Sequence, residues 1–381
     1  MRLRGASFGL ASDVASTSRI HRIGSCFLNR GDRPVGRAWC RLACSVLSSN
    51  AGSADLYTHM ASTGTDDLVL GGLYGLLIGD AVGVPYEFSA PEELPALERI
   101  DMAPPSGFIR AHAAAPTAAW SDDGAQALCL LASLLHRDGL DLTDFGNRLV
   151  NWCDYGYMAV DHIVFDVGSQ TSIALAAIRN GVPAQHAAPA EERHNGNGSL
   201  MRALPLALWH TGSDDELIHD AARQSIPTHA HPRSQICCAL YCLWARATLF
   251  RVDNPWQHAT TVLRRHCAEN AAWSNELEGH VRPDDPPGGS GSGYVVDCLH
   301  SARLALQQPT FERVVQRAIS LGNDTDTTAA VAAGIAGLQH GLAAIPERWR
   351  LALPARDIVD PLAERLLASL RDRARSHPTA G

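Results

Sequence analysis

Apolar residues recur along the chain at a spacing of three to four, and stretches with the alternating pattern of strands are scarce. Such spacing is typical of helices that bury one face or their whole surface. We therefore predict an all-α fold, whose main helices span residues 68–83, 124–139, 170–181, 233–250, 292–307, 310–322, 328–342 and 360–376.

The first of these helices carries a glycine at every fourth position: Gly71, Gly75, Gly79 and Gly83. This spacing places the glycines on one helix face, where another backbone can approach closely. Each glycine costs about 1 kcal/mol of helix propensity relative to alanine, so the stripe needs a packing reason. We expect this helix to lie at the centre of the domain.

Breaks rich in Gly, Pro and Ser fall at residues 103–107, 183–198 and 283–293. Helices of the same character lie on both sides of each break, so we interpret the breaks as loops within one domain. We expect that domain to span residues 63–376.

The first 59 residues have a different composition from the rest: they hold eight Arg, three acidic residues and many Ser. An Arg-rich, Ser-rich and acid-poor segment resembles a mitochondrial presequence. The alternative, which we favour, is a start codon assigned too early, with Met60 as the true first residue. In either case we expect residues 1–62 to be an extension outside the fold, disordered if it is made.

The charge balance excludes some classes of partner. All 32 basic residues are Arg, and the part after residue 59 holds 24 of them against 37 acidic residues. Such an acidic body argues against a nucleic-acid partner. The best apolar run that we identify, 125–135, is shorter than the roughly 18–20 residues of a membrane span, so we expect no membrane partner.

The ten Cys residues form no C-x-x-C pair and few close pairs of any kind. Buried free thiols in a reducing compartment are the default interpretation, so we expect a cytoplasmic protein. The absence of close Cys/His pairs also argues against a zinc site.

Two clusters of oxygen-bearing side chains each precede a helix built from small or apolar residues. Either cluster alone is explained by helix capping, because Ser and Asp are common N-caps. Together they supply more oxygens than two caps need, and converging carboxylates are tolerated only with a cation among them. Hard oxygen ligands select Mg²⁺, Mn²⁺ or Ca²⁺, and two ions could be held. The candidate ligands are Ser121, Asp122, Asp123, Asp324, Asp326 and Thr327.

Seven ordered motifs resemble those of the ADP-ribosylglycohydrolase family, which includes the enzyme that removes ADP-ribose from dinitrogen reductase. They cover about residues 70–340 and read GLLIGDAVGVPYEF (75–88), WSDDG (120–124), DVGSQT (166–171), NGNGSLMRALPLAL (195–208), SIPTHAHP (225–232), GSGYVVDCL (291–299) and GNDTDTTAAVAAGI (322–335). The resemblance implies a compact orthogonal multi-helix bundle with a central binuclear metal cleft.

The resemblance also implies roles for particular residues. The six candidate ligands fall where the family binds two Mg²⁺ or Mn²⁺ ions. Glu87 and Asp166 fall at the reacting centre, and the implied substrate-binding residues are Asn197, Gly198, Ser199, His229 and Tyr294. One departure is Gly124, where the family often has a small hydroxyl residue that would support a metal ligand.

Each of the carried-over residues also has a plainer interpretation. The NGNG loop can be an ordinary turn, although its N–H groups would suit a phosphate. Tyr294 can be a core residue, and Glu87 an exposed loop carboxylate. His229 and His231 can bind phosphate or cap the helix that follows.

These features predict a metal-dependent hydrolase, a monomer, that cleaves the glycosidic bond between ADP-ribose and a protein side chain or a small adduct. Two alternatives stay open: a non-catalytic relative that binds ADP-ribose or serves a structural role, and a metal-dependent phosphoesterase. Glycosidic cleavage through an oxocarbenium-like state needs a placed water and a proton shuttle, which Glu87 or Asp166 can supply.

Overall fold

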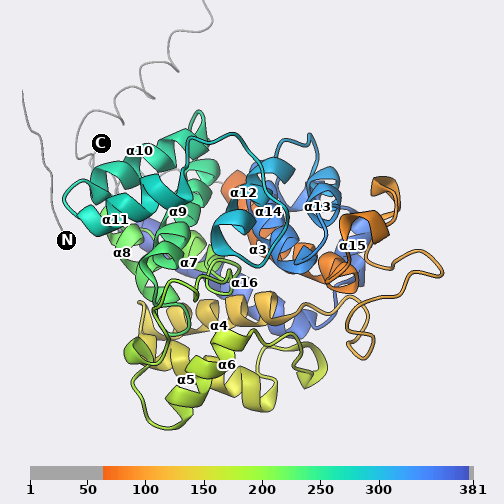
Figure 1. Ribbon diagram of the computed structural model, residues 1–381, viewed down its shortest axis with the longest axis horizontal. Coiled ribbons are helices and arrows are strands. Elements are labelled where there is room, and N and C mark those ends of the chain that lie inside the picture. The colour runs from red at the N-terminus through yellow and green to blue at the C-terminus, as the bar shows by residue number, and fades with distance from the viewer. Residues whose placement is uncertain (1–62, 377–381) are drawn as a thin grey trace, which may run out of the picture. The chain divides into compact units, whose positions relative to one another are not determined.

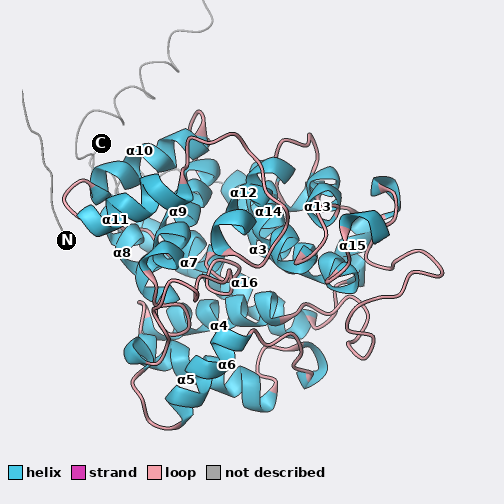
Figure 2. Cartoon of the chain, viewed as in Figure 1, coloured by secondary structure: helices cyan, strands magenta, loops and turns pink. Residues whose placement is uncertain are grey.

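The computed structural model describes residues 63–376, which form helices joined by loops (Figures 1 and 2). They form fourteen α-helices and several single-turn helices, with one isolated β-bridge and no strand among the described residues. The all-α prediction is confirmed. The expectations for residues 1–62 lie outside the described residues.

The eight helices expected from the pattern are all present, with ends shifted by a few residues. They are α3 (Thr63–Gly83), α4 (Asp122–Arg137), α6 (Ser169–Arg179), α9 (Pro232–Leu249), α12 (Val295–Ala305), α13 (Phe311–Ile319), α14 (Thr325–His340) and α16 (Arg356–Ser376). The pattern missed six further helices: α5 (Leu142–Tyr155), α7 (Leu204–Trp209), α8 (Asp214–Ser225), α10 (Pro255–Cys267), α11 (Ala271–Asn275) and α15 (Glu347–Ala352).

Helices α3 and α14 pack antiparallel at the centre, and their contact is made through backbone. A Cβ atom on Gly75 would lie 2.5 Å from the carbonyl oxygen of Ala333, a distance that real Cβ atoms essentially never show. Gly71, Gly79 and Gly83 face the α14 backbone just as closely. The four glycines of α3 are therefore explained by packing, because larger side chains would keep the α14 backbone from approaching.

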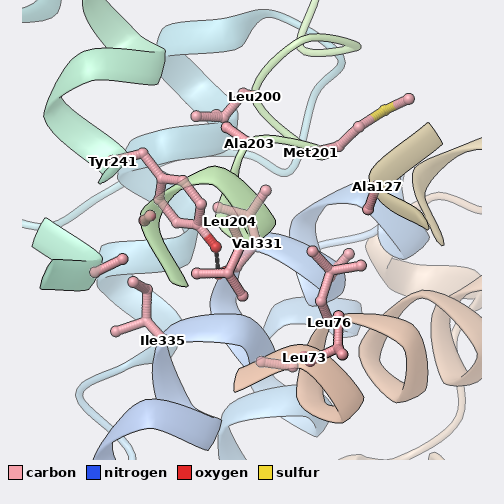
Figure 3. Close-up of a cluster of buried hydrophobic side chains, with 14 of the residues drawn as sticks. Leu73, Leu76, Ala127, Leu200, Met201, Ala203, Leu204, Tyr241, Val331 and Ile335 are labelled. Carbon is pink, nitrogen blue, oxygen red and sulfur yellow. Dashed lines mark hydrogen bonds between the residues drawn. The ribbon is translucent and has the colours of Figure 1, made fainter. Parts of the chain in front are cut away.

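The apolar core surrounds this helix pair and joins it to its neighbours. Figure 3 shows Leu73 and Leu76 of α3 near Val331 of α14 and Leu204 of α7. The Tyr241 hydroxyl, from α9, donates a 3.0 Å hydrogen bond to the backbone oxygen of Val331. Four helices, α3, α7, α9 and α14, are thereby joined in one apolar cluster next to the helix ends that carry acidic residues.

Helix α3 is the one described helix that is long and apolar enough to cross a membrane by composition; the run 125–135 does not qualify. In this structure 94% of its apolar window is buried within the protein. Its apolar character is thus explained by its place in the core.

The glycine contact can be tested with Gly75→Ala. The added methyl group must push α3 and α14 apart, so we expect a loss of roughly 2 kcal/mol of unfolding free energy despite alanine's better helix propensity. Gly139→Ala is the matched control, because the nearest atom to its new Cβ is 4.0 Å away. Chemical denaturation measures both, and equal stability of the two variants would contradict this packing.

Candidate active site

Carboxylates from three helix ends meet at one point. Asp80 lies near the end of α3, Asp123 in the first turn of α4 and Asp326 in the first turn of α14, all fully buried. Their nearest carboxylate oxygens lie within 4.8 Å of one another. The two acidic clusters predicted to converge do so, and the hydroxyl of Thr327 donates a 3.2 Å hydrogen bond to Asp123.

Only part of the first cluster is used to cap the start of α4. The Ser121 hydroxyl accepts from the Asp123 N–H at 3.3 Å, which is an ordinary N-cap. Asp80 accepts from the N–H groups of Ser121 and Gly124 at 2.8–3.0 Å. The helix start is therefore satisfied without the Asp122 and Asp123 carboxylates, which are left for another role.

The start of α14 contradicts the capping interpretation of its cluster. Asp324 occupies the N-cap position, but its side chain accepts no capping hydrogen bond. One oxygen of Asp324 and one of Asp326 are buried without any hydrogen-bond partner. Unpartnered buried carboxylate oxygens are costly, and a bound cation would satisfy both.

A second group of acids adjoins the first. Glu87 is almost fully buried, so the exposed-loop interpretation is wrong. Its carboxylate lies within 4.8 Å of those of Asp324 and Asp326, and it also forms a close group with His112 and Asp166. Asp166 has a left-handed backbone with φ of 54°.

Crowding of these buried acids raises their pKa values. Burial, followed by repulsion from Asp166, Asp324 and Asp80, raises the pKa of Glu87 to about 10. Burial raises the pKa of Asp80 to about 7, although the N–H groups at the start of α4 oppose the shift. The pKa values of Asp122, Asp123 and Asp326 lie well above the usual range for the same two reasons, burial and mutual repulsion.

The donor set fits one or more hard divalent cations. It consists of carboxylate and hydroxyl oxygens, the ligands that Mg²⁺, Mn²⁺ and Ca²⁺ prefer, and it carries excess negative charge in a dry environment. A bound cation would return the raised pKa values toward normal and would pair the two orphaned oxygens of α14.

The glycine-rich loop lies along the edge of this cluster. Gly196 forms an antiparallel bridge with Tyr294, and the N–H of Asn197 donates to Gly293 at 3.0 Å. The Asn197 side chain donates a 2.9 Å hydrogen bond to Asp324. The loop is therefore a paired segment fixed to an acid of the cluster, and it is more than an ordinary turn.

His229 lies under this loop, and a Cβ on Gly198 would come within 2.9 Å of its ring. Burial, with the nearby Arg202, lowers the pKa of His229 to about 3, so its imidazole is neutral. The capping role belongs to the other histidine: His231 accepts from the Arg233 N–H at the start of α9.

Two further residues of the predicted binding set differ in exposure. The Ser199 hydroxyl is fully buried and bonds to Ser225 and Cys238, so its side chain faces inward, away from any ligand on the loop. Tyr294 is 38% exposed, which excludes a core role, and its hydroxyl accepts from Arg233 at 3.2 Å.

Three residues of the site were missed from the sequence. Asp80 and Arg202 each stand as a single charge in an apolar stretch, and that signal could have identified both. Arg202 is fully buried and donates to Gln126, which in turn donates to Asp122. Arg202 thus helps to hold the Asp122 carboxylate in place through Gln126. His112 lies in an alanine-rich loop and offers no such signal.

The departure at Gly124 has a packing explanation. A Cβ at this position would lie 2.7–2.8 Å from side-chain atoms of Trp120. Trp120 is buried and donates from its indole nitrogen to Met158 at 2.9 Å. The indole thus occupies the space that a hydroxyl side chain would need.

Comparison with known proteins identifies the class. The family model for ADP-ribosylglycohydrolase matches residues 61–376. ADP-ribosylarginine hydrolase Tri1 of Serratia proteamaculans (strain 568) is 29% identical over 308 residues, 79% of each chain. ADP-ribosyl-dinitrogen reductase glycohydrolase of Rhodospirillum rubrum is 28% identical over 295 residues, 76% of this chain and 91% of that one.

A solved structure described as an ADP-ribosylglycohydrolase-related protein complex matches with a TM-score of 0.61 and 28% identity. The match covers 81% of this chain and 99% of that one. The chain belongs to the ADP-ribosylglycohydrolase family, and it is accordingly a hydrolase of ADP-ribose linkages.

If the acids bind a cation, Asp326→Asn should leave the stability of the metal-free protein unharmed but reduce its stabilisation by added metal. Asp326→Asn removes a buried charge, so we expect the metal-free variant to be at least as stable as the metal-free wild type. Mn²⁺ at a hundredfold excess over Kd should stabilise the wild type by about 2.7 kcal/mol and the variant far less. Thermal melts with and without Mn²⁺ measure both effects, with the exposed Asp372→Asn as control. An equal response to Mn²⁺ in all three proteins would contradict the site.

The neutral state of His229 predicts a pH dependence of stability. Because its folded pKa lies below the unfolded value of 6.5, its contribution is complete above pH 6.5 and is lost as the pH falls toward 3. At pH 5 the loss is on the order of 2 kcal/mol. Denaturation between pH 7 and 5 should show a flatter decline for His229→Gln than for wild type or for the exposed His219→Gln.

Proposed function

We propose that the chain uses two Mg²⁺ or Mn²⁺ ions to hydrolyse the glycosidic bond between ADP-ribose and an arginine side chain of a modified protein. The observation that carries the metal dependence is the pair of orphaned oxygens on Asp324 and Asp326, set among four other buried acids. Arginine is favoured as the acceptor because relatives from two bacteria are described as ADP-ribosylarginine hydrolases.

The ligands proposed for the ions are Ser121, Asp122, Asp123, Asp324, Asp326 and Thr327, with Asp80 fixing the start of α4. When bound, the ions would supply Lewis acidity and charge neutralisation next to the ribose hydroxyls. No described Arg forms an ion pair with these acids, so bound cations would supply the positive charge that the chain itself does not place there.

The remaining groups bind the substrate and move protons. The N–H of Asn197 is paired with Gly293, so a diphosphate would bind at the N–H groups that follow it in the loop, from Gly198 on, and the partly exposed Tyr294 ring offers a face to a base. Glu87, whose carboxyl lies close to those of Asp324 and Asp326, is placed to exchange a proton with a leaving nitrogen or with a water. Asp166, beside it, is the acid best placed to orient a water.

The two alternative functions make different demands. A non-catalytic relative has no need of the acids, yet Glu87 and all the candidate ligands are present in this chain. A phosphoesterase would use the same carboxylates but would release AMP or phosphate. The released product therefore separates the alternatives.

The experiment offers arginine- and serine-linked ADP-ribosyl peptides to the full-length chain, with and without Mg²⁺ or Mn²⁺, and identifies the product chromatographically. We expect free ADP-ribose from the arginine peptide only when metal is present. The double substitution of Asp324 and Asp326 by Ala should reduce turnover by at least a thousandfold, on the order expected for lost metal catalysis. Near-normal activity of this variant would refute the metal assignment.

A further inference from the structure

An imidazole lies directly on the carboxyl group of Glu87. Nε2 of His112 is 2.6 Å from Oε2 of Glu87, and the two side chains are 15% and 4% exposed. Among the described residues, His112 is the only group in hydrogen-bonding distance of that carboxyl. No motif that identifies the family contains this histidine, which lies between two of them.

Glu87 needs a restraint because its surroundings repel it. The charges that face it are the carboxylates of Asp166, Asp324 and Asp80, and each disfavours a second negative charge nearby. Among the described residues only the His112 imidazole bonds to this carboxyl, so without it no hydrogen bond would oppose rotation of the Glu87 side chain away from these acids. This hydrogen bond fixes the carboxyl in one orientation, whichever of the two groups carries the proton.

His112 is itself held in place by several contacts. Its backbone is left-handed, with φ of 48°, and its carbonyl accepts from Ala115 at 2.8 Å. The N–H of the preceding Ala111 donates to Pro85 at 3.0 Å, which ties this loop to the turn that carries Glu87.

The His112 ring packs between two phenylalanines from the two segments that carry the catalytic acids. Its centroid is 5.5 Å from that of Phe88 and 5.1 Å from that of Phe165. Phe88 follows Glu87, and Phe165 precedes Asp166, so one ring contacts both segments. A shift of the His112 ring would therefore also shift the segments that carry Glu87 and Asp166.

We propose that His112 is a positioning residue, which holds the carboxyl of Glu87 toward Asp166 through one hydrogen bond and keeps the two catalytic segments together through its ring. The proposal rests on the function proposed above. It assigns His112 no contact with substrate and no metal.

Two variants separate the hydrogen bond from the ring packing. His112→Phe keeps an aromatic ring between Phe88 and Phe165 but has no donor, whereas His112→Gln keeps an N–H donor at similar reach. His266→Phe is the matched control, because His266 also contacts a carboxylate, Asp215 at 2.8 Å, and an aromatic ring, yet lies on α10 away from the site.

We expect His112→Phe to lower kcat on the ADP-ribosyl peptide roughly 10- to 100-fold, with KM within about threefold of wild type. His112→Gln should recover most of the lost kcat, and His266→Phe should match the wild type. Mn²⁺ affinity should be unchanged in all of them. Equal kcat for His112→Phe and wild type would overturn the proposal, as would a loss of Mn²⁺ affinity in both His112 variants, which would make His112 a ligand.

A structural readout keeps the test valid if the wild type releases no ADP-ribose, a result that would refute the proposed function alone. Crystal structures of the wild type and His112→Phe should then show the Glu87 carboxyl ordered in the first and rotated or disordered in the second. An unmoved, ordered Glu87 in the variant would overturn the positioning role. A large fall in the melting temperature of His112→Phe but not of His112→Gln would also overturn it, because it would indicate a purely structural loss.

Discussion

Repulsion between buried carboxylates is the constraint on which this active site depends. Asp80, Asp123 and Asp326 are withdrawn from water with carboxylate oxygens within 4.8 Å of one another, and no described basic side chain pairs with them. The surrounding helices hold these acids together, and protonation or a bound cation would relieve the repulsion between them. The fold therefore holds acids in an unfavourable arrangement that a bound cation would relieve.

Close helix packing supplies the force that opposes this repulsion. The glycine stripe of α3 lets the α14 backbone approach until the acids at the helix ends face each other. The hydroxyl of Thr325 adds a 2.8 Å hydrogen bond to the carbonyl of Gly83, which fixes the first turn of α14 against the end of α3. Small residues in the two helices are thus as necessary to the site as the acids, and one of them, Gly83, packs directly against the backbone of Asp326.

The sequence was sufficient to predict the helices whose apolar character is strong, and the convergence of the two acidic clusters. It was insufficient for α7, α11 and α15, which are too short to show a period, and for α8 and α10, whose exposed faces dilute the apolar signal. Ser199 was assigned to the cleft because its neighbours belong there, but its side chain points the other way. His112 was missed because its role comes entirely from a loop conformation that brings it back to Glu87.

The order of the elements along the chain has a consequence for synthesis. Helix α3 is the first described element to leave the ribosome, and its partner α14 is among the last. During translation the glycine face of α3 has no backbone to cover it, and a highly apolar segment stays exposed until nearly all other helices have been made. An uncovered apolar segment of this kind is prone to aggregation during synthesis, and a truncation that removed α14 would leave the glycine face of α3 without its backbone partner.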